Sequence, residues 1–247
     1  MPEGVGARFI PVCDSTNEEA ARLASIKSAQ PMWIVAGEQS KGRGRSGRNW
    51  VSGSGNLYTS LLFAPDLKLS DLAGLPFIIS LAIRETFVTL GGLDGDIQCK
   101  WPNDILINGK KAAGVLIETS GVVGNTVGHI IVGIGMNLLH SPDTAQFPAT
   151  NFFAHIGKKV DPREALTVLA ANVKKRLDKW RVSDFKPIQQ EWTDHAWGIG
   201  KPVQVRSIDE TFSATLLHLA EDGGLKVKLV NGVERTIYAA DIFPGFK

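Results

Sequence analysis

Residues 39–50 read QSKGRGRSGRNW, and this stretch decides both the fold and the class of function. Four cations, Lys41, Arg43, Arg45 and Arg48, alternate with three glycines, and no acidic residue occurs from residue 39 to residue 65. A segment so rich in glycine and charge cannot form part of a core, so it predicts a mobile loop. Glycine lets backbone N–H groups approach a ligand, and guanidinium groups bind phosphate or carboxylate through paired hydrogen bonds. We interpret it as a loop that closes over an anionic ligand; a solvated basic loop and a flexible RNA-binding segment are the alternatives.

Three further stretches place polar groups or glycines beside apolar strands. Residues 100–104 read KWPND, a cation and two polar side chains at a turn whose proline fixes their direction. Residues 109–114, GKKAAG, lead into an apolar strand, and residues 133–137, GIGMN, interrupt the most apolar part of the chain. Glycines inside a central strand indicate a bulge or a ligand that lies close against the backbone. A solvated lysine at a strand edge and simple helix-on-sheet packing are the structural alternatives.

Hydrophobic periodicity predicts a mixture of helices and strands. Helices are expected up to about residue 28, after a capping box at Ser15–Glu18 or Thr16–Glu19, and at 75–90, 162–180 (with Asp161 as N-cap) and 185–193. Strands are expected at residues 7–12, 32–36, 56–63, 97–100, 105–107, 110–119 and 127–138. Past residue 198 only short β-runs follow, at 203–206, 212–219, 225–229 and 235–238. The pattern predicts two domains, residues 1–197 and a small all-β barrel at 198–247.

Composition and residue counts exclude several classes of protein. The 27 Lys and Arg against 25 Asp and Glu give a net charge of +2, whereas a general nucleic-acid binder carries a large basic excess. No apolar run approaches ~20 residues and no signal pattern is seen, so we expect no membrane insertion and a cytoplasmic protein. Cys13 and Cys99 are interpreted as small buried residues, not as nucleophiles or part of a disulfide framework. The nearest two of the five histidines, His129 and His140, are eleven residues apart (140 − 129), so no metal site is predicted.

In this order and spacing, the stretches resemble the biotin protein ligase family, also called the biotin–[acetyl-CoA-carboxylase] ligases. The motifs GRGRxGRxW at 42–50 and KWPND at 100–104 carry the resemblance, which extends over about the whole chain. It implies an α+β fold: a mixed central sheet with flanking helices, as in class II synthetase-like catalytic domains, plus a small C-terminal SH3-like β-barrel. Ser46, where some members carry arginine, and Ile134, where some carry alanine, depart from the pattern.

The resemblance also implies a site, residue by residue. Ser15, Thr16 and Gln39 match residues that hold the ureido ring of biotin, and Gly133 and Ile134 line its pocket. Tyr58 and Ser60 match the strand beside the ligand, and Gly114 and Val115 match the backbone near the valeryl tail. The residues implied to bind biotin or ATP are Ser15, Thr16, Asn17, Gln39, Gly42, Arg43, Arg45, Arg48, Trp50, Tyr58, Ser60, Lys100, Asn103, Asp104, Lys111, Gly114, Val115, Gly133, Ile134 and Asn137.

Three of these residues, Lys111, Arg45 and Arg43, are implied to be catalytic. Gly42 and the two arginines match the loop that closes over biotin and the adenylate phosphate, and Lys111 matches the lysine at the biotin carboxylate and α-phosphate. Lys100, Asn103 and Asp104 match the nucleotide side, without an individual role for each. No Ser-His-Asp or Cys-His device is needed, because the substrate carboxylate is itself the nucleophile. Asp104 is a candidate general base for the transfer to an amine.

The reaction implied by the resemblance has two steps and uses biotin, ATP and Mg²⁺. Biotinyl-5′-AMP forms first, and biotin then passes to a lysine of a biotin carboxyl carrier protein. Because the catalytic pattern begins within the first 15 residues, we expect a monofunctional ligase without DNA binding, as a monomer or homodimer. The alternatives are a lipoate or octanoate ligase or transferase of the same superfamily, and a nucleotide- or RNA-binding module without catalysis.

Overall fold

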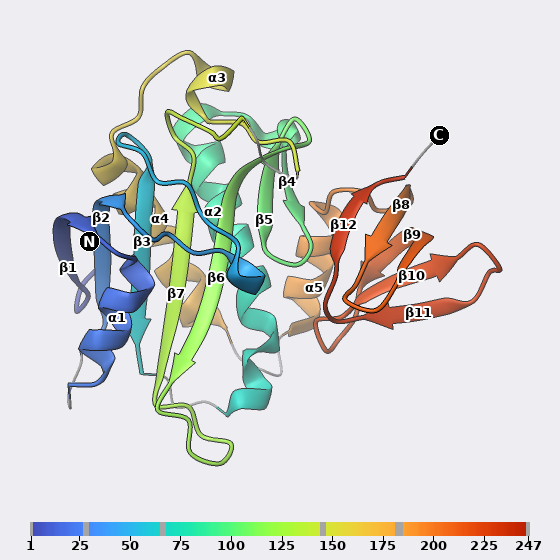
Figure 1. Ribbon diagram of the computed structural model, residues 1–247, viewed down its shortest axis with the longest axis horizontal. Coiled ribbons are helices and arrows are strands. Elements are labelled where there is room, and N and C mark those ends of the chain that lie inside the picture. The colour runs from blue at the N-terminus through green and yellow to red at the C-terminus, as the bar shows by residue number, and fades with distance from the viewer. Residues whose placement is uncertain (1, 27–29, 65–67, 144–146, 181–184, 246–247) are drawn as a thin grey trace.

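The computed structural model describes residues 2–26, 30–64, 68–143, 147–180 and 185–245, and a seven-stranded sheet forms its centre (Figure 1). The strands lie in the order β1-β2-β3-β7-β6-β5-β4. The β1–β2 pair is parallel and the other neighbours are antiparallel, so the predicted mixed sheet is confirmed. Every strand expected here is present: β1 Gly6–Cys13, β2 Met32–Gln39, β3 Leu57–Phe63, β4 Ile97–Lys100, β5 Asp104–Ile107, β6 Lys110–Ser120 and β7 His129–Met136.

Helices cover both faces of this sheet. Helix α1 (Thr16–Ala24) packs its alanines on one face, in a small apolar cluster of Ala20, Ala24, Ile34, Leu62 and Ile131. Helices α2 (Leu75–Gly91) and α4 (Pro162–Lys179) pack on the other face, where they form the main core (Figure 1). The other helical elements are α3 Phe153–Ile156, which was not predicted, α5 Phe185–Asp194, and the 3-10 turns η1 Arg45–Gly47, η2 Leu69–Gly74 and η3 Asp94–Asp96.

The two predicted helix N-caps have different outcomes. Asp161 caps α4, because its Oδ1 accepts the N–H of Arg163 at 2.7 Å, and Pro162 occupies the first turn. The predicted capping box of α1 is wrong: Ser15 makes no side-chain cap bond, and the helix ends at Ala24. Residue 28, the expected end of α1, lies outside the described residues. The Thr16 hydroxyl instead bonds to Gln39 Oε1 at 3.2 Å, so the local capping rule gives way to a contact between elements.

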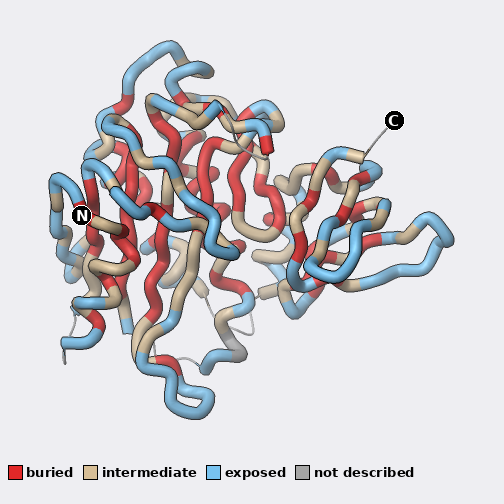
Figure 2. Tube along the Cα trace, viewed as in Figure 1, coloured by how far each residue is buried: buried red, intermediate tan, exposed pale blue. Residues whose placement is uncertain are grey.

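Helix α2 corrects the expectation that no apolar run approaches membrane-spanning length. Together with the turn before it, the segment Leu72–Gly91 is long and apolar enough to cross a bilayer, but 67% of its most apolar window is buried inside the protein. A helix that is apolar all round has this composition when it forms the centre of a core. Figure 2 shows buried backbone along the central sheet and the helices behind it, with exposed backbone at the loops.

A second, antiparallel sheet of five strands forms the C-terminal part, as predicted. Its order is β11-β10-β9-β8-β12. Four strands were expected and the last, β12, was not; the bounds are β8 Pro202–Arg206, β9 Thr211–Leu219, β10 Leu225–Leu229, β11 Glu234–Ile237 and β12 Asp241–Pro244. The segment that leads from α5 into this sheet pairs with β4, since Cys99 donates its N–H to His195 O at 2.9 Å and Trp197 donates to Cys99 O at 2.8 Å.

The apolar core continues across this junction. One cluster of buried side chains includes Phe77 of α2, Trp192 of α5 and Leu216 of β9, with the Phe77 and Trp192 rings edge to face at 5.3 Å. The Trp101 indole also donates to Gly223 O of the second sheet at 3.3 Å. The C-terminal part is therefore held in a fixed position beside the central sheet, close to the KWPND turn.

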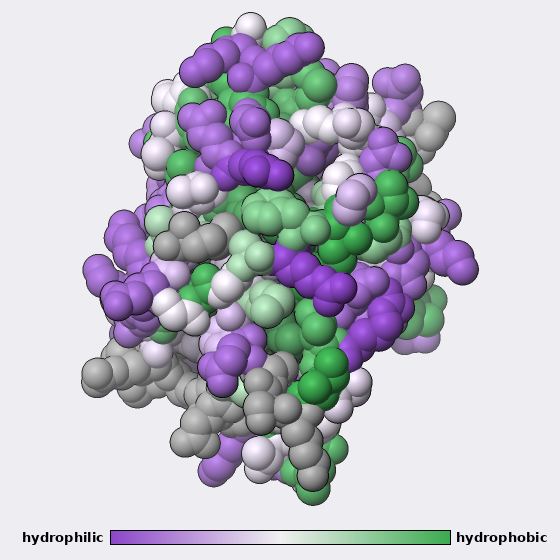
Figure 3. Space-filling model, turned by 90° about the vertical axis from the view of Figure 1, so that its left-hand side faces the viewer, coloured by the Kyte–Doolittle hydropathy of each residue, from purple (hydrophilic) through white to green (hydrophobic). Residues whose placement is uncertain are grey.

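At its far side the central sheet ends in strand β1. This strand pairs only with β2 in the sheet order and exposes Phe9 and Val12. Figure 3 shows this side of the molecule, on which hydrophobic and hydrophilic side chains are interspersed. Helix α1 and the stretch of residues 39–50 cross the front of the sheet (Figure 1).

Candidate active site

A cavity of about 420 Å³ lies on the front face of the sheet, under the glycine- and arginine-rich loop. Figure 1 shows this loop in blue, crossing β7 and β6 toward β5 and β12. Seventeen of the twenty predicted binding residues line the cavity, although they come from five separate stretches of the chain: Ser15, Thr16, Asn17, Gln39, Arg43, Arg45, Arg48, Trp50, Lys100, Asn103, Asp104, Lys111, Gly114, Val115, Gly133, Ile134 and Asn137. The other three, Gly42, Tyr58 and Ser60, are buried and do not line the cavity.

A polar network closes the end of the cavity next to α1. Gln39 Oε1 accepts the backbone N–H of Thr16 at 2.8 Å, and Gln39 Nε2 donates to Ser52 Oγ at 3.0 Å. Behind them, the buried Ser60 hydroxyl lies 2.7 Å from Thr16 Oγ1 and 2.6 Å from Asn17 Oδ1. The side chains that face the cavity are thus held in place by β2 and β3, and they offer both donors and acceptors to a small polar ring.

The floor of the cavity is made of glycines because larger residues would collide there. A Cβ on Gly133 would lie 2.3 Å from Asn17 Oδ1, and one on Gly135 would lie 2.5 Å from the Trp50 ring. Gly114 pairs with Gly135 across β6 and β7, and a Cβ there would lie 3.0 Å from the same ring. The sequence predicted that something lies close against the backbone at these glycines. In the structure it is the Trp50 indole, which occupies a slot that the glycines form in the sheet.

Next to this slot, three charged side chains form a buried cluster on strands β4, β5 and β6. Lys111 Nζ lies 2.6 Å from Asp104 Oδ1, and Lys100 Nζ lies 3.8 Å from Asp104 Oδ2 and 4.3 Å from the centre of the Phe147 ring. Burial lowers the pKa of Lys100. Burial by itself raises the pKa of Asp104, but Lys111 and Lys100 outweigh it, so this pKa lies below its usual value.

This geometry is unfavourable for Asp104 as a general base. A carboxylate whose pKa is lowered by two cations holds a proton poorly at neutral pH, so it contributes little to proton abstraction. Its position suits another role, because it fixes the directions of Lys100 and Lys111 toward the cavity. The prediction that Asp104 is the base is therefore not supported by its surroundings.

The loop over the cavity is tied by its own backbone. Trp50 donates its N–H to Gly42 O at 2.9 Å and Gly44 donates to Arg48 O at 2.7 Å, around the turn η1. Gly42 is required at the crossing, since a Cβ would lie 2.4 Å from Trp50 O. The expected loop is present, folded here into a narrow ribbon; its mobility stays a prediction.

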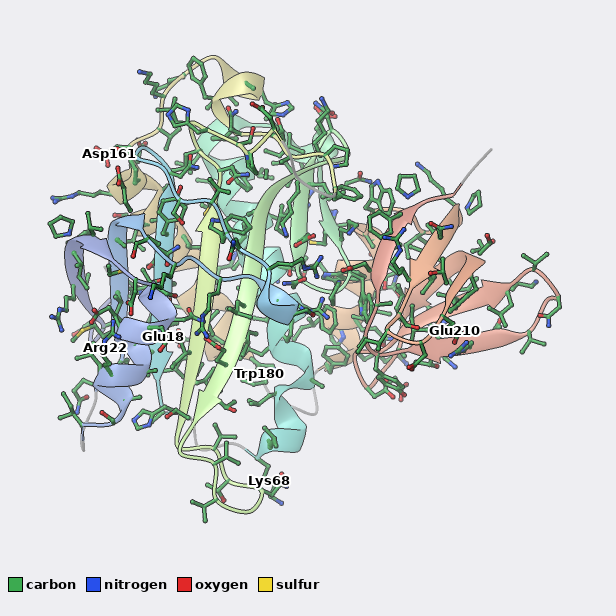
Figure 4. The ribbon with its side chains drawn as sticks, viewed as in Figure 1. Glu18, Arg22, Lys68, Asp161, Trp180 and Glu210 are labelled. Atoms are coloured by element: carbon green, nitrogen blue, oxygen red, sulfur yellow. The ribbon has the colours of Figure 1, made fainter. Side chains whose placement is uncertain are left out.

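Each of the three loop arginines points in a different direction and has its own partners. Arg43 pairs with Glu18 of α1 at 2.7 Å and with Glu118 of β6 at 3.2 Å, and Figure 4 shows Glu18 on α1. Arg45 is more than half buried and donates to Asn103 Oδ1 at 3.2 Å. Arg48 donates two hydrogen bonds to Asp241 of β12, at 3.0 and 3.3 Å. Of the three, Arg45 is turned toward the buried cluster at the KWPND turn.

Sequence reasoning missed eleven of the lining residues. Some adjoin recognised motifs and could have been found from them, namely Gly44, Asn49, Val51, Pro102, Leu116 and Gly135. The others carry no local signal: Pro142, Phe147, Ala149, Asp241 and Phe243. The two from β12 show that the C-terminal sheet contributes to the cavity wall.

Both cysteines are small buried residues, as the sequence predicted. Both cysteines are buried, and burial raises the pKa of Cys13 to about 11 and that of Cys99 to about 12, so neither is a ready nucleophile. Within the described ranges, no group of three or more His, Cys, Asp or Glu side chains could hold a metal ion. Asp104 is the carboxylate that faces the buried end of the cavity.

Comparison with known proteins agrees with this arrangement. The model of the biotin/lipoate A/B protein ligase family matches residues 9–137, and that of the biotin protein ligase C-terminal domain matches residues 198–245. The biotin–[acetyl-CoA-carboxylase] ligase of Paracoccus denitrificans is 35% identical over 240 residues, which cover 94% of this chain and 98% of that protein. The bifunctional ligase/repressor BirA of Bacillus subtilis is 33% identical over 238 residues, covering 94% of this chain and 71% of that protein.

A solved structure has the same architecture. The biotin protein ligase from Aquifex aeolicus in complex with biotin and ATP superposes with a TM-score of 0.80 at 28% identity, over 96% of this chain and 97% of that chain. The similarity thus extends over both sheets and includes the junction between them.

Proposed function

The chain belongs to the biotin/lipoate A/B protein ligase family, and from this premise we propose that it joins biotin to a lysine of a carrier protein through biotinyl-5′-AMP. One observation carries the proposal. A polar end, an aromatic slot and a buried cationic cluster follow one another along a single cavity. Biotin has the matching order of groups: a polar ureido ring, an apolar ring and tail, and a terminal carboxylate.

The ureido ring is assigned to the end formed by Ser15, Thr16 and Gln39. The Gln39 amide oxygen accepts from the Thr16 N–H and hydroxyl, and its Nε2 donates to Ser52 Oγ, which leaves one Nε2–H for a ligand in the cavity. The apolar ring and tail lie along the Trp50 indole and the glycine slot of β6 and β7. This placement brings the biotin carboxylate to Lys111, at the beginning of the cationic cluster.

In the first step, a carboxylate oxygen of biotin attacks the α-phosphorus of ATP. The new acyl–phosphate bond forms as the bond from the α-phosphorus to the bridging oxygen breaks, and pyrophosphate leaves with the electron pair. Two anions must be brought together, so the protein contributes alignment and positive charge. Lys111, Lys100 and Arg45, which all line the cavity, supply that charge.

Mg²⁺ fits this site as part of the nucleotide. It prefers phosphate oxygens and water with one or two carboxylates, and Asp104 is the one carboxylate at the buried end of the cavity. Bound there, the ion would neutralise phosphate charge. The residues of this chain provide the rest of the electrostatic field.

In the second step, the amine of the acceptor lysine attacks the acyl carbon, the acyl–oxygen bond breaks and AMP leaves. The amine must lose its proton before attack, since its ordinary pKa lies near 10.4. Until it arrives, the mixed anhydride must be kept from water. The loop of residues 42–50 lies over the cavity and suits this protective role.

The decisive experiment is exchange of labelled pyrophosphate into ATP by the purified protein. We expect exchange with biotin and ATP, none without biotin, and little with lipoate or octanoate in its place. Transfer of label from biotin to a carrier domain, and to its lysine-to-arginine variant as a control, then tests the second step. Equal or faster exchange with lipoate would overturn the assignment of biotin, and absence of exchange with every acid would overturn adenylate chemistry.

A further inference from the structure

The turn at the tip of the loop is held from the C-terminal sheet by a single side chain, Asp241. Arg48 Nη2 donates to Asp241 Oδ1 at 3.0 Å, and Arg48 Nη1 donates to Asp241 Oδ2 at 3.3 Å. Two parallel bonds between a guanidinium and a carboxylate fix direction as well as distance. The partners are 193 residues apart in the chain, so the contact ties the loop to the second domain.

The contact continues from Arg48 to the cationic cluster. Arg48 Nε donates to the carbonyl of Arg45 at 3.2 Å, and the Arg48 backbone N–H donates to the same carbonyl at 3.2 Å. The Arg45 side chain in turn donates to Asn103 Oδ1 at 3.2 Å. Arg48, which Asp241 holds, therefore fixes the backbone of Arg45, whose guanidinium faces the KWPND turn.

Asp241 itself is held in a defined place. It begins β12, where it pairs with Arg206 of β8, and its neighbour Ile242 is buried in the core of the second sheet. Because side chains alternate along a strand, Asp241 and Phe243 face the opposite way, into the cavity wall. The second sheet is fixed against the first through Trp101 and Cys99, so the carboxylate does not depend on the loop for its position.

The Arg48–Asp241 ion pair contributes too little free energy to be important for the stability of the fold. The Arg48 and Asp241 side chains are 44% and 35% exposed, and an exposed ion pair contributes only about 0–1 kcal/mol to folding stability. A small free energy is nevertheless enough to shift a loop between open and closed states several-fold. The net effect is expected on the loop and not on the fold.

We infer that Asp241 is a positioning residue for the adenylation reaction: it orients Arg48, and through Arg48 the turn that carries Arg45 toward the phosphates of ATP. The inference rests on the proposed function. In this role the Asp241 carboxylate does not touch the reacting atoms; it sets the geometry of the loop that binds phosphate. Loss of the carboxylate should weaken ATP binding and let biotinyl-AMP escape, while the rate at saturating ATP changes little.

The test compares Asp241→Asn with the wild type in biotin-dependent pyrophosphate exchange. We expect the KM for ATP and the rate of biotinyl-AMP release to rise about three- to ten-fold, with kcat within about two-fold. Asp241→Glu, which keeps the charge, should lie closer to the wild type. An unchanged KM and release rate in Asp241→Asn would overturn the inference, and so would an equal loss of kcat.

A double-mutant cycle separates positioning from direct contact. If Asp241 acts through Arg48, then Asp241→Asn should have no further effect in an Arg48→Gln background. If the effect persists in full there, Asp241 contacts the nucleotide directly and the inference is wrong. Glu210→Gln is the matched control: the Glu210–Arg235 pair, at 2.6 Å and 43% and 46% exposed, lies within the same C-terminal sheet, and Figure 4 shows Glu210 there, away from the central sheet.

A second readout does not require enzymatic activity. In the ligand-free protein, Asp241→Asn should be cut by trypsin within residues 41–48 faster than the wild type, because the turn opens more often, and Glu210→Gln should not. Unchanged cleavage would contradict the inference. If the wild type catalysed no exchange, the proposed function would fail, whereas an active wild type with an indifferent Asp241→Asn variant would refute this inference alone.

Discussion

The cations of this site fall into two groups that are held in different ways. Lys100 and Lys111 come from strands β4 and β6, are partly or wholly buried, and share one carboxylate, Asp104. Arg43, Arg45 and Arg48 come from a ribbon outside the sheet and pair with groups on α1, β6, the KWPND turn and β12. The two lysines share one partner on the strand between them, while each loop arginine has its own partners outside the loop.

The difference divides the work of adenylation. A charge fixed in a buried place stabilises a transition state without reorganisation at the moment of reaction. A loop that opens and closes can let a substrate enter and then cover it, and the charges on the loop contact the substrate only in the closed state. The strand-borne lysines are therefore expected to control the chemical rate, and the loop arginines to control binding and retention of the intermediate.

The largest expected effect follows from removing a strand-borne cation. Lys111→Ala should lower the rate of biotinyl-AMP formation by about 10²- to 10³-fold, because one preorganised electrostatic partner of the phosphoryl group is lost. Rapid-quench measurement of biotinyl-AMP at saturating substrates checks this. Since Asp104 loses a partner, circular dichroism and a thermal unfolding curve must show that the variant is folded. A folded variant with the parental rate would remove Lys111 from the mechanism and, with it, the distinction between the two groups.

The loop should respond to ligands in a way that the strands do not. We expect trypsin to cut the free protein among Lys41, Arg43, Arg45 and Arg48, and biotin with ATP to slow these cuts at least about ten-fold at saturation. The protease reaches only the open loop, and ligands that bind the closed form reduce its population. Gel analysis of cleavage over time, with the exposed Lys201 as an internal reference site, measures the effect.

Two variations of this experiment sharpen it. ATP alone should protect less than biotin with ATP, because the intermediate binds both ends of the cavity. Arg45→Ala should reduce protection at the remaining loop sites and release biotinyl-AMP faster, since a phosphate-facing donor is lost. Cleavage that is equally fast with and without both ligands would show that the ribbon is not a lid.

The two groups also differ in how far the sequence could predict them. The strands were found because their apolar periodicity is a local signal, and the motifs identified in the sequence gave the five stretches that meet at the cavity. The partners were not found, because Asp241 and Phe147 are brought to the site by tertiary packing and neither lies in a motif. The sequence contains 25 acidic residues and does not identify which of their carboxylates faces a given arginine.

The failed capping box of α1 shows the same limit. Thr16 has the residue type of a cap, but its hydroxyl lies 3.2 Å from Gln39 Oε1 and 2.7 Å from the Ser60 hydroxyl, while the Ser15 side chain makes no cap bond. Local propensity is overridden where a site requires those hydroxyls. Helix α4, which has no such competition at its start, follows the rule with Asp161.

The smallest expected effect concerns acid stability, and it tests whether the strand-borne cluster is paired before any ligand binds. An unfolded aspartate has a pKa near 3.9, and the pKa of folded Asp104 is lower because Lys111 and Lys100 outweigh its burial. Above about pH 5 the group is ionised in both states, so its contribution to stability is complete there. It is lost as the pH falls through the lower, folded pKa.

Asp104→Asn should therefore be less stable than the wild type near pH 6, and the difference should shrink as the pH falls from about 5 to about 2. Urea unfolding at a series of pH values measures it. Asp222→Asn is the control, because a hydrogen bond from Tyr238 and the N–H of Gly224 lower the pKa of that exposed carboxyl outside the cavity. The stability difference between Asp222→Asn and the wild type should shrink in the same direction, and this variant should keep full adenylation activity, whereas Asp104→Asn should lose activity as well.

A stability difference for Asp104→Asn that stayed constant from pH 6 to pH 2 would mean that Lys100 and Lys111 are not paired with this carboxylate in solution. The strand-borne cations would then be as dependent on the ligand as the loop, and the division between the two groups would disappear.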